Sequence, residues 1–148
     1  KPMFTWVGKF GSGLAPVCIG TSTENCTIGF INTSGEFEIN PQYEYFEFYD
    51  SESSWGITAQ HGFFEGLARV MVDQKIGYIN STGKMVIQPQ FTYGGNFVNG
   101  LARVTVNGKM GFINKKGVLV VPAIYDSAFN FYQGRAAVEV DGKWGFIS

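Results

Sequence analysis

Residues 97–114 read FVNGLARVTVNGKMGFIN, and the pattern of this stretch recurs along the chain of 148 residues. Residues 63–80 read FFEGLARVMVDQKIGYIN, and residues 131–147 read FYQGRAAVEVDGKWGFI. The glycine that precedes the Leu-Ala-Arg segment, or its equivalent, recurs every 34 residues, at Gly66, Gly100 and Gly134. Self-similarity at this period is the signature of a repeat architecture.

A looser copy of the same pattern comes first in the chain. Phe10 and Gly13 begin it, and residues 29–32 (GFIN) continue it after a longer hairpin. The units are therefore predicted at residues 10–43, 63–91, 97–125 and 131–148 of one repeat domain spanning residues 1–148. Residues 1–9 match the tail of a preceding unit, and insertions are predicted near residues 21–25 and 44–62.

Each unit contains the signals of an antiparallel meander. Ala102, Val104 and Val106 alternate with polar residues, a period of two that is typical of a strand buried on one face. Asn107-Gly108 and Asp141-Gly142 lie between such runs and are typical of two-residue type I′ hairpin turns. A third short strand follows in the first three units and is expected to end at Pro41, Pro89 or Pro122, because proline has no N–H for the ladder.

The predicted fold class is therefore all-β. A single three-stranded meander of this size is only marginally stable, so neighbouring units are expected to cover each other's apolar faces. We expect tandem antiparallel three-stranded β-meander repeats of about 34 residues, stacked into one domain that is either elongated or ring-like.

The repeated segments resemble the WG repeats, a bacterial family of β-units named after a Trp-Gly pair. Gly-Leu-Ala-Arg-Val, Gly-Lys-Met-Gly-Phe-Ile-Asn and Lys-Lys-Gly carry the resemblance, and Trp144-Gly145 retains the pair itself. Other apolar residues replace the Trp in the remaining units, and Asn stands where the family usually has Asp; these residues are Ile28, Ile76 and Met110, and Asn32, Asn80 and Asn114. The resemblance implies a non-catalytic repeat array, often exported or attached to other domains, with no active site to transfer.

Charge is distributed unevenly although the formal net charge is only −1. Residues 1–74 hold nine acidic and three basic residues, whereas residues 75–148 hold three acidic and eight basic residues, which gives −6 and +5. The bases are spread over every turn, so nucleic acid is not expected as a partner. No apolar run approaches the roughly 20 residues that span a bilayer, so no membrane span is expected.

Cys18 and Cys26 flank a turn-like stretch. In a hairpin their side chains would face each other across the strands and form a small-loop disulfide, and the alternative is two buried free thiols in a reducing compartment. The disulfide, together with a start at Lys1 rather than Met, favours a secreted, extracellular or cell-surface bacterial protein.

No residue constellation predicts chemistry. His61 is the only histidine, and a loop histidine without a partner is expected to be inert. We expect no enzyme, no catalytic residue, no metal site and no cofactor.

Candidate ligand or partner residues are aromatic residues of the loops and two arginines in equivalent positions: Trp6, Tyr45, Tyr49, Trp55 and Tyr93, with Arg69 and Arg103. We expect these arginines to point away from the core, either as a solvated face or as a ladder that binds acidic groups. The preferred hypothesis is a protein-interaction or structural module that pairs with other copies of itself through open edge strands and oppositely charged halves. The alternative is a carbohydrate or cell-wall binder that stacks its aromatic residues on sugars.

Overall fold

The computed structural model describes residues 3–47 and 61–148. All regular secondary structure in these residues is β-strand, and every strand pairing is antiparallel. The strands are β1 (Trp6–Val7), β2 (Ala15–Ser22), β3 (Asn25–Ile31), β4 (Phe37–Glu44), β5 (Phe63–Phe64), β6 (Leu67–Val72), β7 (Lys75–Asn80), β8 (Met85–Phe91), β9 (Tyr93–Gly94), β10 (Leu101–Val106), β11 (Lys109–Asn114), β12 (Leu119–Tyr125), β13 (Ser127–Ala128), β14 (Ala136–Val140) and β15 (Lys143–Ile147).

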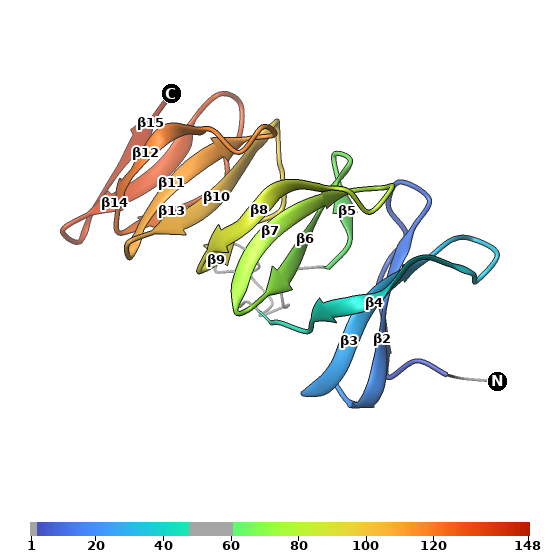
Figure 1. Ribbon diagram of the computed structural model, residues 1–148. Coiled ribbons are helices and arrows are strands. Elements are labelled where there is room, and N and C mark those ends of the chain that lie inside the picture. The colour runs from blue at the N-terminus through green and yellow to red at the C-terminus, as the bar shows by residue number, and fades with distance from the viewer. Residues whose placement is uncertain (1–2, 48–60) are drawn as a thin grey trace.

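The units follow one another in an elongated row with the two chain ends at opposite extremes (Figure 1). We number them by their central hairpins: unit 1 has β2–β3, unit 2 has β6–β7, unit 3 has β10–β11 and unit 4 has β14–β15. A third strand follows the hairpin in units 1 to 3, namely β4, β8 and β12. The all-β repeat prediction is confirmed, and of the two shapes left open the array is elongated.

Pairs of left-handed residues form the tight turns. At the hairpin turn of unit 3, Asn107 and Gly108 have φ of 50° and 77°, as a type I′ turn requires. A second turn of the same kind precedes each hairpin; in unit 3 it is formed by Asn99 and Gly100, with φ of 53° and 79°. The 34-residue spacing of the glycines therefore marks a turn in every unit, because glycine adopts positive φ at little cost.

The repeated asparagine forms the next turn. Asn114 Oδ1 accepts hydrogen bonds from the backbone N–H groups of Lys116 and Val118, both at 3.0 Å. Asn32 and Asn80 make the equivalent pair of bonds in units 1 and 2. An aspartate carboxylate can accept the same bonds, which explains the Asp usual at this position of the family pattern.

The prediction that proline ends the third strand is wrong, because β4, β8 and β12 all continue past it. Phe30 pairs with Ile39 and Ile28 pairs with Tyr43, so the third strand bulges opposite Gly29. The same irregularity occurs in β8 and β12. A bulge accommodates a residue that lacks an N–H, so Pro41 interrupts the ladder without ending the strand.

The bulge explains why a glycine occupies the second position of the Trp-Gly pair in units 1 to 3. A Cβ on Gly29 would lie 2.7 Å from the backbone nitrogen of Pro41, and one on Gly77 would lie 2.7 Å from the backbone nitrogen of Pro89. On Gly111 it would lie 2.6 Å from the carbonyl oxygen of Val121. Only glycine allows the third strand to approach this closely.

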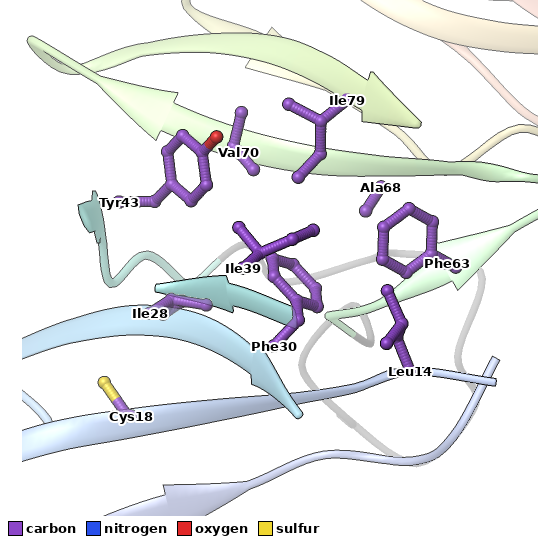
Figure 2. Packing of buried hydrophobic residues seen from close by; sticks show 10 residues of the cluster. All are labelled: Leu14, Cys18, Ile28, Phe30, Ile39, Tyr43, Phe63, Ala68, Val70 and Ile79. Carbon is purple, nitrogen blue, oxygen red and sulfur yellow. The ribbon is translucent and has the colours of Figure 1, made fainter. Parts of the chain in front are cut away.

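The core lies between the units, as Figure 2 shows for units 1 and 2. There Phe30 and Ile39 of unit 1 face Ala68 and Val70 of unit 2. Two further clusters of buried apolar side chains repeat the arrangement, one between units 2 and 3 and one between units 3 and 4. Each unit is thus stabilised mainly by its neighbours.

Stacking on both sides corrects the prediction of strands buried on one face. In β6, Leu67 to Val70 are all buried, and in β7, Ile76 to Ile79 are all buried. Val70 faces unit 1, whereas Leu67 belongs to the cluster shared with unit 3. Alternation in a stacked sheet therefore separates the previous neighbour from the next one rather than core from solvent.

Candidate docking surfaces at the two ends of the array

Aromatic pairs join every two consecutive units. Phe30 of unit 1 meets Phe63 at a ring-centroid distance of 5.1 Å and an interplanar angle of 60°. The equivalent pairs are Tyr78 with Phe97, at 5.0 Å and 71°, and Phe112 with Phe131, at 4.9 Å and 75°. Such edge-to-face pairs add about 0.5–1.5 kcal/mol beyond the area they bury. The first ring of each pair comes from the second strand of one unit, and the second ring precedes the hairpin of the next.

The two candidate arginines lie at the same interfaces, which corrects their predicted place on a solvated face. Arg69 and Arg103 are each only 3% exposed. The Nη1 of Arg69 donates to the carbonyl oxygen of Gly94 at 3.0 Å, and the Nη1 of Arg103 donates to that of Ala128 at 2.8 Å. Each arginine thus ties its hairpin to the short strand that begins the next unit.

The turns before the hairpins are also linked from unit to unit. Gly100 N–H donates to the carboxylate of Glu65 at 2.9 Å, and Lys115 Nζ lies 3.4 Å from the same carboxylate. One unit further on, the side-chain amide of Asn99 donates to the carbonyl oxygen of Phe131 at 3.0 Å. These exposed contacts fix the register of the stack more than they stabilise it.

At the C-terminal end, the residues that would face a further unit are exposed. Phe146 occupies the position of Tyr78 and Phe112, which are buried, yet it is 77% exposed. Trp144 is 51% exposed and stacks on Phe129 with centroids 5.2 Å apart. A hollow of about 550 Å³ lies beside them, lined by Phe129, Asn130, Tyr132, Gln133, Arg135, Ala137 and Phe146.

The N-terminal end exposes the complementary position. Phe10 is equivalent to Phe63 and Phe97, which are buried against the preceding unit, yet it is 55% exposed. Met3 and Val7 are also exposed on the segment that leads into unit 1. The two ends together therefore present one member of each class of ring that pairs inside the array.

His61 is not a loop histidine without a partner, which corrects that prediction. It is buried between aromatic rings, with centroid distances of 5.1 Å to Trp6, 5.4 Å to Tyr45 and 4.4 Å to Phe46. Burial, reinforced by the positive charge of Arg69, lowers the pKa of His61 to about 4, so the ring is neutral at pH 7.

The aromatic candidates do not form one surface. Trp6 and Tyr45 pack with His61 near the junction of units 1 and 2. Tyr93 lies on β9, and the guanidinium carbon of Arg103 is 6.0 Å from the centroid of its ring. Tyr49 and Trp55 lie outside the described residues.

Cys18 and Cys26 are joined in a disulfide with their Cα atoms 5.6 Å apart. They lie on the neighbouring strands β2 and β3, where Cys18 pairs with Ile28 and Cys26 pairs with Gly20. The bridge is therefore diagonal across the hairpin, and its Cα separation is in the usual range for disulfides.

The described residues contain no group of three His, Cys, Asp or Glu side chains that could hold a metal ion. Within residues 3–47 and 61–148 there is also no helix of the length and apolarity that crossing a membrane requires.

The geometry defines a class: a stacked β-repeat array whose core residues lie between the units. The chain belongs to the family of WG-containing repeats, whose model matches residues 28–53, 76–109 and 110–144, more than half of its length. These matches begin at Ile28, Ile76 and Met110, the positions that correspond to Trp144. Ile28 and Ile76 are buried against the next unit, which accounts for the apolar residues at this position. No curated protein and no solved structure matches the chain.

Sequence reasoning missed the role of the arginines and the aromatic pairs. Both had a signal: Arg69 and Arg103 share one register, and each aromatic pair combines two positions of the repeat. A shared repeat position indicates that the same contact recurs in each unit. It does not indicate which neighbouring unit the side chain contacts.

Proposed function

We propose that the protein is a non-catalytic, extracellular structural module that binds proteins, in the first place other copies of itself, through its edge strands and its oppositely charged halves. One observation carries the proposal. The same kinds of contact, edge-to-face ring pairs and an arginine bonded to a backbone carbonyl, join consecutive units of the array. A surface of this repeated kind can receive another unit, whether that unit belongs to the same copy or to a second one.

A non-catalytic role is consistent with what the repeated residues do. The glycines form turns or make room for the bulge, the asparagines cap turns, and the aromatic residues and arginines join units. Each of these repeated features thus has a structural contact that explains it.

Two further features support association between copies. The two faces of a unit differ, so a contact between units of two copies is head-to-tail. The opposite net charges of the two halves of the sequence favour this orientation and speed encounter at low salt.

Sedimentation velocity over a hundredfold range of protein concentration, at low and at high salt, tests this function. We expect species larger than a monomer that grow with concentration, with faster association at low salt. A single monomeric species under all conditions would contradict self-association.

The extracellular location is supported by the disulfide between Cys18 and Cys26, because such bonds persist in oxidising compartments. Thiol labelling of the protein isolated from its source under denaturing conditions tests it. We expect no reactive thiol, and two labelled thiols would place the protein in a reducing compartment.

Carbohydrate or cell-wall binding is the second candidate function. A hollow of about 480 Å³ beside Tyr45 favours it, because Glu24, Asn25 and Glu44 add polar groups next to the ring. A glycan array with the unmodified protein and with Tyr45→Ala tests this candidate. Binding that the variant loses would support it, and no binding by the unmodified protein would end it.

A further inference from the structure

We propose that Asn107 is a site of spontaneous covalent modification, where the hairpin turn of unit 3 loses its side-chain amide and becomes aspartyl or isoaspartyl. The reaction is deamidation, and its co-reactant is water. Asn-Gly is the dipeptide most prone to it, because glycine has no Cβ to shield the backbone nitrogen that attacks the asparagine amide. The sequence has two such dipeptides, Asn99-Gly100 and Asn107-Gly108, and the structure protects only the first.

The two dipeptides are closely matched in sequence and in backbone conformation. Each follows a valine. Asn99-Gly100 has φ of 53° and 79°, and Asn107-Gly108 has φ of 50° and 77°. In both turns the residues on either side pair with each other through the backbone. A difference in the rate of deamidation must therefore come from the contacts of the two turns.

Both reacting groups of Asn99-Gly100 are held by other units. The N–H of Gly100, whose nitrogen would attack, donates to Glu65 Oε1 at 2.9 Å. The side-chain amide of Asn99, which contains the leaving nitrogen, donates to the carbonyl oxygen of Phe131 at 3.0 Å. Attack requires the amide to turn toward the nitrogen of Gly100, so both bonds must break first and the reaction is slowed.

The same groups of Asn107-Gly108 have no such contacts. Within residues 3–47 and 61–148, neither the side chain of Asn107 nor the N–H of Gly108 has a hydrogen-bond partner. Both residues are exposed. Rearrangement of the turn alone therefore brings the amide of Asn107 to the attacking nitrogen.

The hairpin turn of unit 3 also lacks the carboxylate that ties the corresponding turns to the preceding unit. The N–H of Asp73 donates to Glu44 Oε1 at 2.7 Å in unit 2, and the N–H of Asp141 donates to Asp126 Oδ2 at 2.8 Å in unit 4. The repeat places Thr92 at the position of these two acids, and in the described chain it makes no hydrogen bond to the turn. Among the hairpin turns of units 2 to 4, that of unit 3 is therefore the least restrained.

The reaction balances with one molecule of water. The nitrogen of Gly108 gives its proton to a solvent base and bonds to Cγ of Asn107, while the bond from Cγ to the side-chain nitrogen breaks and releases ammonia. Water then opens the resulting succinimide ring. Cleavage between Cγ and the nitrogen of Gly108 gives aspartate, and cleavage between the backbone carbonyl carbon of Asn107 and that nitrogen gives isoaspartate.

The repeat shows that the aspartate product fits the turn. Asp73 and Asp141 occupy the position of Asn107 in units 2 and 4, with φ of 50° and 51°. Aspartate at Asn107 therefore keeps the hairpin and adds one negative charge to the basic half of the chain. Isoaspartate lengthens the backbone of a two-residue turn by one carbon, so it should disturb the pairing of β10 with β11.

Peptide mapping by mass spectrometry, after incubation of the intact folded protein at mildly alkaline pH, tests the inference. Cleavage after Lys and Arg puts Asn107 on the peptide of residues 104–109 and Asn99 on that of residues 85–103, so each site is measured separately. We expect deamidation of Asn107 to be about tenfold faster than that of Asn99, because two hydrogen bonds restrain only the latter. Incubation in urea should bring the two rates together.

A pair of variants tests the cause of the difference. Glu65→Gly removes the acceptor of the Gly100 N–H and keeps the positive φ of 52°, so it should speed deamidation of Asn99 and leave that of Asn107 unchanged. Gln133→Gly is the matched control, because Gln133 occupies the same turn position in unit 4 with φ of 49°. It should change neither rate.

Three outcomes would overturn the inference. The first is an equal rate at the two sites in the folded protein, or a faster rate at Asn99. The second is an Asn107 that stays intact in the folded protein for as long as the protein in urea takes to deamidate. The third is a Glu65→Gly variant in which Asn99 reacts as slowly as before, since the contacts of the turn would then not cause the selectivity.

Discussion

Gly111 shows how one residue position depends on a neighbouring strand. A Cβ there would lie 2.6 Å from the carbonyl oxygen of Val121 and 2.8 Å from the backbone nitrogen of Ala123. Both contacts are with backbone, so relief requires β12 to move. The glycine of the family's Trp-Gly pair is thus required by the third strand wherever that strand is present.

Gly111→Val is therefore expected to lower the free energy of unfolding by about 2–3 kcal/mol or more, the usual cost of overpacking. Gly145→Val is the matched control, since the space beside it is open, and it should change stability by less than about 0.5 kcal/mol. Urea denaturation of both variants measures the difference. Equal losses would show that the glycine serves its own hairpin rather than the third strand.

His61 predicts a dependence of stability on pH. Its pKa is about 4 in the folded protein and 6.5 in the unfolded chain, so between these values only the unfolded state takes up the proton. Stability from this group is therefore fully present above pH 6.5 and is lost as the pH falls toward 4, by about 3 kcal/mol in total.

The variant His61→Phe keeps an aromatic ring in the cluster and cannot titrate. Thermal unfolding followed from pH 7 to pH 4 should decline less for this variant than for the unmodified protein. Parallel curves would mean that His61 is accessible to protons in the folded state. The carboxylates titrate in both proteins, so their contribution to the pH dependence of stability cancels in the comparison.

At the scale of the elements, the turns were predictable because their causes are local. Asn107-Gly108 needs positive φ at both residues, and that requirement is visible in two letters of sequence. The strand ends were less predictable. Proline was expected to stop the third strand, but the bulge opposite Gly29 depends on a partner strand ten or more residues away.

Asn114 allows a test of the turn that follows each hairpin. Asn114→Ala leaves the N–H groups of Lys116 and Val118 without their acceptor and should cost about 1–2 kcal/mol of stability. Asn114→Asp keeps an acceptor and should be nearly neutral. Chemical denaturation checks both, and an aspartate variant as unstable as the alanine variant would contradict the assigned role.

Arg103 tests how neighbouring elements are joined. Arg103→Met keeps the apolar stem but loses the bond to the carbonyl oxygen of Ala128, at an expected cost of about 2 kcal/mol. Arg135 is the control, because it is exposed directly before β14 of unit 4. Arg135→Met should leave the stability of the monomer unchanged within about 0.5 kcal/mol. If both variants lose little, the buried arginine does not tie unit 3 to unit 4.

At the scale of the whole molecule, the sequence predicted that units stack, but not which face meets which neighbour. Arg69 and Arg103 alternate with apolar residues, and in an isolated sheet such positions face water. In the stack they face the next unit. The same alternation therefore separates residues that contact the preceding unit from residues that contact the next one.

The most direct test of this arrangement is a crystal structure of the protein. We expect Phe30 against Phe63, Tyr78 against Phe97 and Phe112 against Phe131, edge to face and at centroid separations of 4.9–5.1 Å. Arg69 and Arg103 should be buried at the same interfaces. Units that do not stack on each other, or arginines that are exposed to solvent, would contradict the stacked arrangement.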